Sequence, residues 1–188
     1  MSTAEAPQHL VEAGLAASTA DACIVLVDRS ASANLRWANN TLTTNGVMHG
    51  GDISVISFVA GAHGTATASV SRSGATLDAV RGVVAAADAA ARAADTAEDA
   101  APLIAGEASA DWDEPPATTS IRTFDAFAPA LGEAFGGADA ARRVLSGYVE
   151  HTVDTTYLGS SSGLRLRHAQ PSGHVGVTGK SADLTRSA

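Results

Sequence analysis

The sequence contains a single cysteine, Cys23, which excludes an intrachain disulfide and a cluster of zinc-binding thiolates. Cys23 stands in the apolar run DACIVLVD, so we interpret it as a buried structural thiol rather than a reactive one. Aromatic residues are also scarce, at 4% of the chain, whereas hydrophobic residues in total make up 45%. We therefore expect a core built mainly from Ala, Val, Leu and Ile, with few large anchors.

Basic residues are few, with 12 Lys and Arg against 20 Asp and Glu, which gives a net charge of −8. Such a charge opposes non-specific attraction to nucleic acid and to anionic membrane surfaces. The chain has no apolar run of transmembrane length, because Asp88 and Arg92 interrupt the longest alanine-rich segment. The first residues lack the basic and apolar regions of a signal peptide, so we expect a cytoplasmic protein.

Motifs that bind nucleotides or catalytic metals are absent: there is no P-loop, no G-x-G-x-x-G after a strand and no H-E-x-x-H. Asp154 and His168 are expected to face each other across a hairpin, which an exposed cross-strand pair explains. A zinc site would need a third ligand, and no residue is placed to supply it. We therefore assign no catalytic, no cofactor-binding and no metal-binding residue.

The stretch Gly159-Ser160-Ser161-Ser162-Gly163 fits the G-x-S-x-G pattern of a serine hydrolase, in which Ser161 would be the nucleophile. That role requires a strand, a sharp turn and then a helix. Here the following residues, LRLRH, alternate with a period of two and predict a second strand. We interpret Ser161 as a residue of a hairpin turn.

Arg36 and Trp37, followed by Asn39 and Asn40, would suit base stacking or peptide binding. The alternative is a half-buried indole at the end of a strand beside a turn. The acidic net charge favours this second interpretation.

The pattern of apolar residues predicts an α+β fold with antiparallel meanders packed against helices. An opening helix is expected over residues 7–18, strands over 22–30, 33–38 with 41–48, 52–60 and 64–71, and a helix capped by Ser73 or Thr76. These elements form a first module over residues 1–94. An acidic, Pro-containing linker over 95–120 follows, with Trp112 as its anchor onto a neighbouring core.

A second module is expected over residues 121–188. Its helix would present Phe124, Phe127, Leu131 and Phe135 on one face, and Pro129 would kink or divide it. Strands then follow in LSGYVEHTVDTTYLG, GLRLRHAQ and SGHVGVTGK. We expect these strands to form a second sheet that is incomplete at the C-terminal end of the chain.

Three stretches carry a resemblance to a known family: CIVLVDRSASANLRWANNTLTTNGVMHGGDISVISFV, TYLGSSSGLRLR and the closing KSADLTRSA. With the alanine-rich helix between them, they resemble the N-terminal half of a PmbA (TldE) type subunit of the TldD/PmbA family. The resemblance covers nearly all 188 residues, although these motifs are structural and not catalytic.

The resemblance implies a cytoplasmic metallopeptidase system that cleaves unfolded or extended peptides. In such a system the TldD-type subunit carries an H-E-x-x-x-H zinc motif, and the PmbA-type subunit is its non-catalytic partner. No residue of this chain matches that motif, so no zinc ligand is carried over and the chain alone is expected to be inactive. Edge strands of its sheets could hold a peptide by strand addition.

Two alternatives remain open. The chain could be a stand-alone interaction or dimerisation module without a role in proteolysis, or the N-terminal half of a TldD-type subunit. The first is distinguished by its partner, since the peptidase interpretation requires a companion with H-E-x-x-x-H. The second is distinguished by the sequence downstream.

Overall fold

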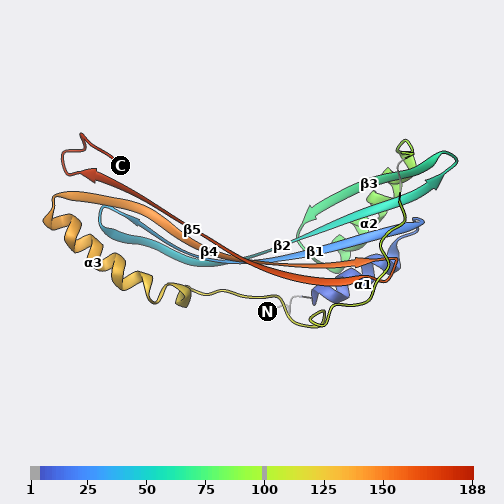
Figure 1. Cartoon of the computed structure of the whole chain (residues 1–188), viewed down its shortest axis with the longest axis horizontal. Coiled ribbons are helices and arrows are strands. Elements are labelled where there is room, and N and C mark those ends of the chain that lie inside the picture. The colour runs from blue at the N-terminus through green and yellow to red at the C-terminus, as the bar shows by residue number, and fades with distance from the viewer. Residues whose placement is uncertain (1–4, 99–100) are drawn as a thin grey trace. The chain divides into compact units, whose positions relative to one another are not determined.

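The computed structural model describes residues 5–98 and 101–188 and confirms the α+β class. Its elements, in chain order, are α1 (Pro7–Ala17), β1 (Ala22–Ala38), β2 (Thr41–Gly61), β3 (Gly64–Ser73), α2 (Leu77–Ala93), the 3₁₀ turn η1 (Ile121–Phe124), α3 (Phe127–Ala140), β4 (Arg143–Ser160) and β5 (Arg165–Ser181). The strands form one five-stranded sheet in the order β3-β2-β1-β4-β5, as Figure 1 shows. The expectation of two separate sheets is therefore wrong, because β4 joins the first meander beside β1.

Contacts divide the chain into two compact units. Unit 1 comprises Met1–Arg29, Gly50–Pro116 and Thr155–Ala169, and unit 2 comprises Ser30–His49, Ala117–Asp154 and Gln170–Ala188. The units are interleaved along the chain, since β1, β2, β4 and β5 each contribute one end to each unit. The domain ranges 1–94, 95–120 and 121–188 stay a prediction from the sequence.

Strands are longer than the sequence predicts. Residues 22–30 and 33–38 belong to one strand, β1, and the expected strands 41–48 and 52–60 belong to β2. The interval between the expected strands 41–48 and 52–60 predicts a turn at Gly50 and Gly51, but the backbone there stays extended. A side chain at Gly51 would collide with the Arg29 guanidinium, so this glycine makes room for a neighbour instead of reversing the chain.

The turn between β1 and β2 does follow the local prediction. Asn39 and Asn40 have φ angles of 51° and 56°, the left-handed values that a two-residue hairpin turn requires. The Asn40 side chain also donates to the backbone oxygen of Arg143 (2.8 Å) and accepts from the backbone N–H of Leu145 (2.7 Å). The turn is thereby fixed to the start of β4 within unit 2.

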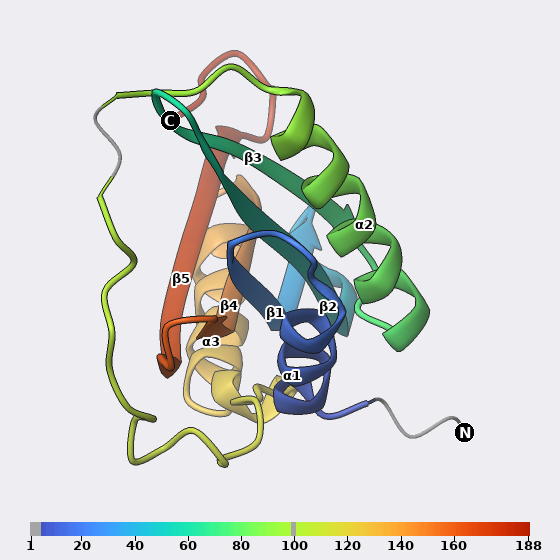
Figure 2. The same cartoon turned by 90° about the vertical axis from the view of Figure 1, so that its right-hand side faces the viewer.

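Unit 1 has an aliphatic core between the sheet and the two helices α1 and α2, which lie beside each other in Figure 2. The predicted helix start at Thr76 is confirmed, because its side chain accepts a hydrogen bond from the backbone N–H of Ala79. The fully or almost fully buried residues of this core include Leu10, Val11, Val25, Val27, Ile53, Val55, Val80 and Val84.

A buried carboxylate ties α2 to the start of the sheet in unit 1. Asp88 is 3% exposed and accepts hydrogen bonds from the Ser57 hydroxyl (2.6 Å), the Thr19 backbone N–H (2.7 Å) and the hydroxyls of Ser18 (3.0 Å) and Thr19 (3.1 Å). Burial opposes ionisation of this carboxyl, but the four donors outweigh it, so the pKa of Asp88 lies below its ordinary value. The charge is stabilised by donors and needs no cation.

The linker packs along unit 1 as an irregular segment, and Trp112 is its anchor as predicted. Trp112 is 9% exposed and meets the Tyr157 ring edge-on at a centroid distance of 5.8 Å. Arg167 of β5 donates to Asp111 Oδ2 (3.1 Å) and to the backbone oxygen of Pro115 (2.9 Å). The Tyr157 hydroxyl donates to the backbone oxygen of Glu114 (2.7 Å), so both side chains hold residues 111–115 against β4 and β5.

Unit 2 has a smaller, more aromatic core between α3 and one face of its strands, as Figure 1 shows. The predicted face of Phe124, Phe127, Leu131 and Phe135 contributes to it, together with Trp37 and Leu35. The helical segment divides at Asp125 and Ala126, not at Pro129. Pro129 lies in the first turn of α3, where its missing N–H would have no partner within the helix.

We predict that Asp88→Asn lowers the free energy of unfolding by about 2 kcal/mol, because an amide cannot accept from all four donors. Because the folded pKa is lowered, the contribution of Asp88 is present above the ordinary Asp pKa of about 4 and is lost as pH falls through the folded value. Denaturant titrations between pH 2 and 7 should show a weaker acid dependence in the variant. The control is Asp78→Asn, at an exposed position of α2. The prediction would be contradicted if Asp88→Asn kept the acid dependence of the unmodified chain, or if Asp78→Asn lowered the free energy of unfolding as much as Asp88→Asn.

We predict that Arg167→Met loosens residues 105–116, because the linker loses its contacts to the guanidinium. Limited proteolysis within this segment should accelerate on the order of tenfold, as local opening becomes cheaper. Arg122→Met is the matched control, because Arg122 forms only an exposed ion pair with Asp125 (3.8 Å). Equal proteolysis of both variants would show that Arg167 does not hold the linker.

Candidate functional site

Ser161 is a turn residue, as the sequence predicts. It lies between β4 and β5, and its backbone N–H donates to the oxygen of Cys23 (2.9 Å). Its hydroxyl accepts from the Cys23 backbone N–H (3.0 Å), and Gly163 takes a positive φ of 102°. The hydroxyl is thus used to attach the hairpin to the start of β1, and the element after it is a strand and not a helix.

Cys23 is buried, at 2% exposure, which confirms the structural interpretation of its thiol. Burial is the main cause that raises the pKa of Cys23, and the charge of Asp88 acts in the same direction, although Ser18 opposes both. The thiol therefore stays protonated and a poor nucleophile at neutral pH.

Asp154 and His168, the other sequence candidates, lie on neighbouring strands of the sheet. Asp154 lies on β4 in unit 2 and His168 on β5 in unit 1, and both side chains are exposed. Within residues 5–98 and 101–188, no three His, Cys, Asp or Glu side chains are grouped as metal ligands would be. Within the same ranges, no helix combines the length and hydropathy of a membrane span.

Trp37 is not available for stacking on a ligand. It is 2% exposed and packs against Phe127 at a ring centroid distance of 6.0 Å. Of the two interpretations, the indole beside a turn is correct, although the ring is fully rather than half buried. Its Nε1 has no hydrogen-bond partner among the described residues.

The outer edge of β5 is one feature that could bind another chain. β5 is the last strand of the sheet, so only β4 pairs with it as a strand. On the other side, the backbone N–H groups of Gly179 and Ser181 donate to the oxygens of Ala188 (2.8 Å) and Arg186 (3.0 Å). The N–H and C=O groups of successive residues along a strand point alternately to its two sides. Those of Gly173, Val175 and Val177 therefore point to the same outer side as those of Gly179 and Ser181.

This open stretch has a boundary at each end. Pro171 has no N–H to offer, and its oxygen accepts from the Gln170 side chain (2.9 Å). At the other end, residues 186–188 cover the edge through an antiparallel bridge between Lys180 and Ser187. No bond from the outer side to Gly173, Val175 or Val177 is recorded in the part of the chain that the structure describes. Residues 173–177 thus form an uncovered edge segment.

The β5 edge already pairs with extended backbone at a second place. In unit 1, Ala108 forms a parallel bridge with Arg165, and the Ser109 backbone N–H donates to the Arg165 oxygen (2.8 Å). The Arg167 backbone N–H donates to the Ser109 hydroxyl (3.3 Å). One strand edge therefore pairs with a parallel segment in unit 1 and with an antiparallel one in unit 2.

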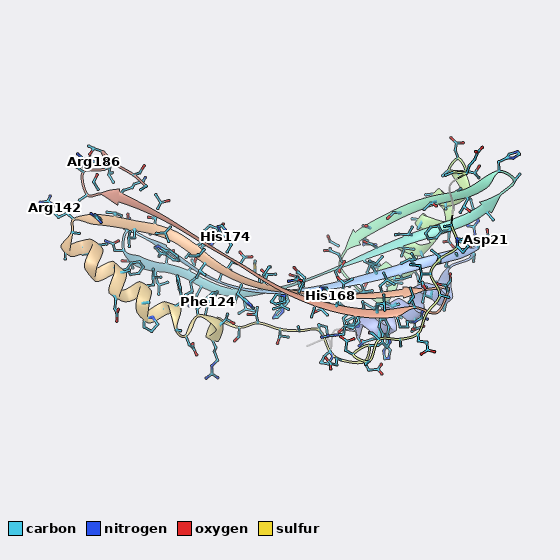
Figure 3. All side chains as sticks on the ribbon, in the orientation of Figure 1. Asp21, Phe124, Arg142, His168, His174 and Arg186 are labelled. Carbon is cyan, nitrogen blue, oxygen red and sulfur yellow. The ribbon has the colours of Figure 1, made fainter. Side chains whose placement is uncertain are left out.

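The side chains around residues 173–177 differ on the two faces of the strand. Val175 and Val177 are 54% and 56% exposed on one face. The adjacent residue, His174, lies on the opposite face, where its ring is 5.2 Å from that of Tyr148, and the Arg36 guanidinium carbon lies 5.9 Å from the Tyr148 ring centroid. Figure 3 labels His174 on this strand. A peptide strand added to this edge would therefore have Val175 and Val177 on one face of the sheet, and His174, Tyr148 and Arg36 on the other.

Comparison with known proteins gives similarity in structure only. No family model and no curated protein matches the sequence. TldE from Thermococcus kodakarensis superposes with a TM-score of 0.59 at 14% identity, and the match covers 92% of this chain and 38% of that one. A candidate modulator of DNA gyrase from Bacteroides thetaiotaomicron gives a TM-score of 0.55 at 13% identity, with 92% and 39% covered.

A second candidate modulator of DNA gyrase, from Thermotoga maritima, gives a TM-score of 0.50 at 12% identity, with 85% and 36% covered. The chain thus spans less than two fifths of the length of each of these proteins. At such identities the likeness concerns the fold, and it extends over nearly the whole of this chain. The chain has a TldE/PmbA-like fold.

Proposed function

We propose that this chain is part of a non-catalytic, TldE-type subunit that holds unfolded or extended peptides for cleavage by a zinc-bearing TldD-type subunit in the cytoplasm. The observation that carries the proposal is the uncovered edge at residues 173–177 of β5. The TldE-like fold supports the choice of partner.

Strand addition explains how this edge would hold a peptide without recognising one sequence. Gly173, Val175 and Val177 offer backbone N–H and C=O groups at intervals of two residues, which match those of any extended peptide. A segment of about five residues would pair along the uncovered edge at residues 173–177. A folded substrate would not present its backbone in this way, so the edge favours unfolded chains.

The role of the partner follows from what this chain contains. The sequence has no H-E-x-x-x-H motif, and the described residues offer no grouped metal ligands. In the proposal, hydrolysis therefore belongs to the TldD-type subunit, and this chain positions the substrate. A companion without that motif, recovered with the endogenous protein, would instead favour the stand-alone interaction module.

We predict that Val175→Pro weakens binding of an extended apolar peptide about tenfold, because proline removes an outward N–H and its hydrogen bond. Pro is tolerated on an edge strand, and Val175→Ala is the matched control that keeps the N–H. Fluorescence anisotropy with a labelled peptide measures binding, and circular dichroism checks that both variants fold. Equal affinity of the two variants would exclude strand addition at this edge.

The link to proteolysis is tested in the reconstituted complex with the TldD-type subunit. Cleavage of an unfolded peptide should require both subunits, and Val175→Pro in this chain should raise the KM without changing kcat, because it affects substrate binding alone. Unchanged cleavage after omission of this chain would contradict the proposed function.

A further inference from the structure

Four basic side chains line one cleft of unit 2. Arg142 and Arg143 come from the junction between α3 and β4, Lys180 from the end of β5, and Arg186 from the segment that follows. Figure 3 shows Arg142 and Arg186 at the same end of the unit. The remaining lining residues carry no acidic side chain: Ala141, Leu145, Gly179, Ser181, Ser187 and Ala188.

None of these four cations has a carboxylate partner among the described residues. The ion pairs present in that part of the chain involve Arg122, Arg165 and Arg167. This concentration of unpaired positive charge is unexpected in a chain with a net charge of −8. At physiological salt, like charges within about 8 Å repel one another, so a bound anion would stabilise the cluster.

The acidic residues nearest in sequence, Asp139 and Asp183, lie outside the cleft lining. Asp139 accepts from the Asn40 side chain (2.5 Å), and Asp183 accepts from the Ser181 hydroxyl (2.5 Å) and from Thr185. Both carboxylates are thus engaged by uncharged donors, and neither lines the cleft. Every charged side chain of the lining is basic.

The backbone around the cleft is fixed by hydrogen bonds. Arg142 has a left-handed φ of 52°, and its oxygen accepts from the Ala182 N–H (2.9 Å). The Arg143 oxygen accepts from Asn40 (2.8 Å), and Ser181 and Arg186 are joined through their backbones. Arg142 keeps a backbone conformation that is uncommon for residues other than glycine, and these bonds oppose its relaxation.

We propose that this cleft binds the carboxylates of acidic peptide segments and so gives the peptide-holding edge a preference for substrates with acidic clusters. The inference rests on the proposed function, because Lys180 follows Val177 by three residues, about 10 Å, on the same strand. Residues 186–188 end the pairing there, so the unpaired end of a peptide held at residues 173–177 would meet the cleft. A nucleic acid is disfavoured, because its many phosphates would be repelled by the net charge of the chain.

The test compares two labelled peptides with the same apolar half, one ending in four Glu residues and one ending in four Gln residues. The acidic peptide should bind on the order of tenfold more tightly at 50 mM salt, and the advantage should disappear at 500 mM. The variant with Arg142→Gln, Lys180→Gln and Arg186→Gln should lose the advantage but bind the neutral peptide normally. Arg122→Gln is the control for a charge change outside the cleft.

Equal binding of the two peptides to the unmodified chain would overturn the inference, as would an equal loss in Arg122→Gln. Tighter binding of a single-stranded oligonucleotide than of the acidic peptide would overturn it as well. Failure of the proposed function is distinguishable, because Val175→Pro would then leave the neutral peptide unaffected. If Val175→Pro lost binding of the neutral peptide but the unmodified chain showed no preference for the acidic peptide, the peptide-holding edge would be supported and the role of the cleft would be excluded.

Discussion

The N–H and C=O groups on the outer side of β5 form the constraint on which this account depends. An edge strand must satisfy these groups without a neighbouring strand, and a long uncovered edge invites pairing with other chains. This chain covers part of the edge with its own segments: Ala108 and Ser109 in unit 1, and Arg186 to Ala188 in unit 2. Pro171 removes one donor, and in the described part of the chain no outer partner is found for residues 173–177.

Each unit supports its part of this strand by a different kind of interaction. In unit 1 the hydrogen bonds of Arg167 and Tyr157 hold the linker beside β5, while Asp88 fixes α2 to the start of β1 and to β2. In unit 2 the aromatic contacts of Trp37 and Phe127 secure α3, and Asn40 fixes the β1–β2 turn to β4. Polar contacts thus fix much of the packing between helices, linker and strands in a chain with few aromatic residues.

Local sequence signals predicted the elements but not their lengths or their sheet. Asn39 and Asn40 gave the correct turn because left-handed backbone is a local property. Gly50 and Gly51 suggested a second turn, but Gly51 serves to admit Arg29, a side chain that is distant in sequence. The merging of two expected sheets into one depends on the pairing of β1 with β4, which no local pattern encodes.

At the candidate site, too, local features could be predicted from the sequence, and features that depend on distant residues could not. Sequence reasoning correctly interpreted Ser161 as a turn residue, because the alternation in LRLRH is local, and it proposed strand addition in general terms. It did not locate the edge, although Pro171 within a strand pattern is a signal for an edge strand. The basic cleft was missed because Arg142 and Arg186 are 44 positions apart and meet only through the fold.

Amide hydrogen exchange at single-residue resolution tests the central claim most directly. In the free chain, the outward amides of Val175 and Val177 should exchange quickly, while those of Gly179 and Ser181 should already be protected by residues 186–188. An extended peptide should slow exchange at Val175 and Val177 by about tenfold or more and leave the inward amide of Gly176 unchanged. Uniform slowing along β5, or protection elsewhere in the chain alone, would contradict strand addition at this edge.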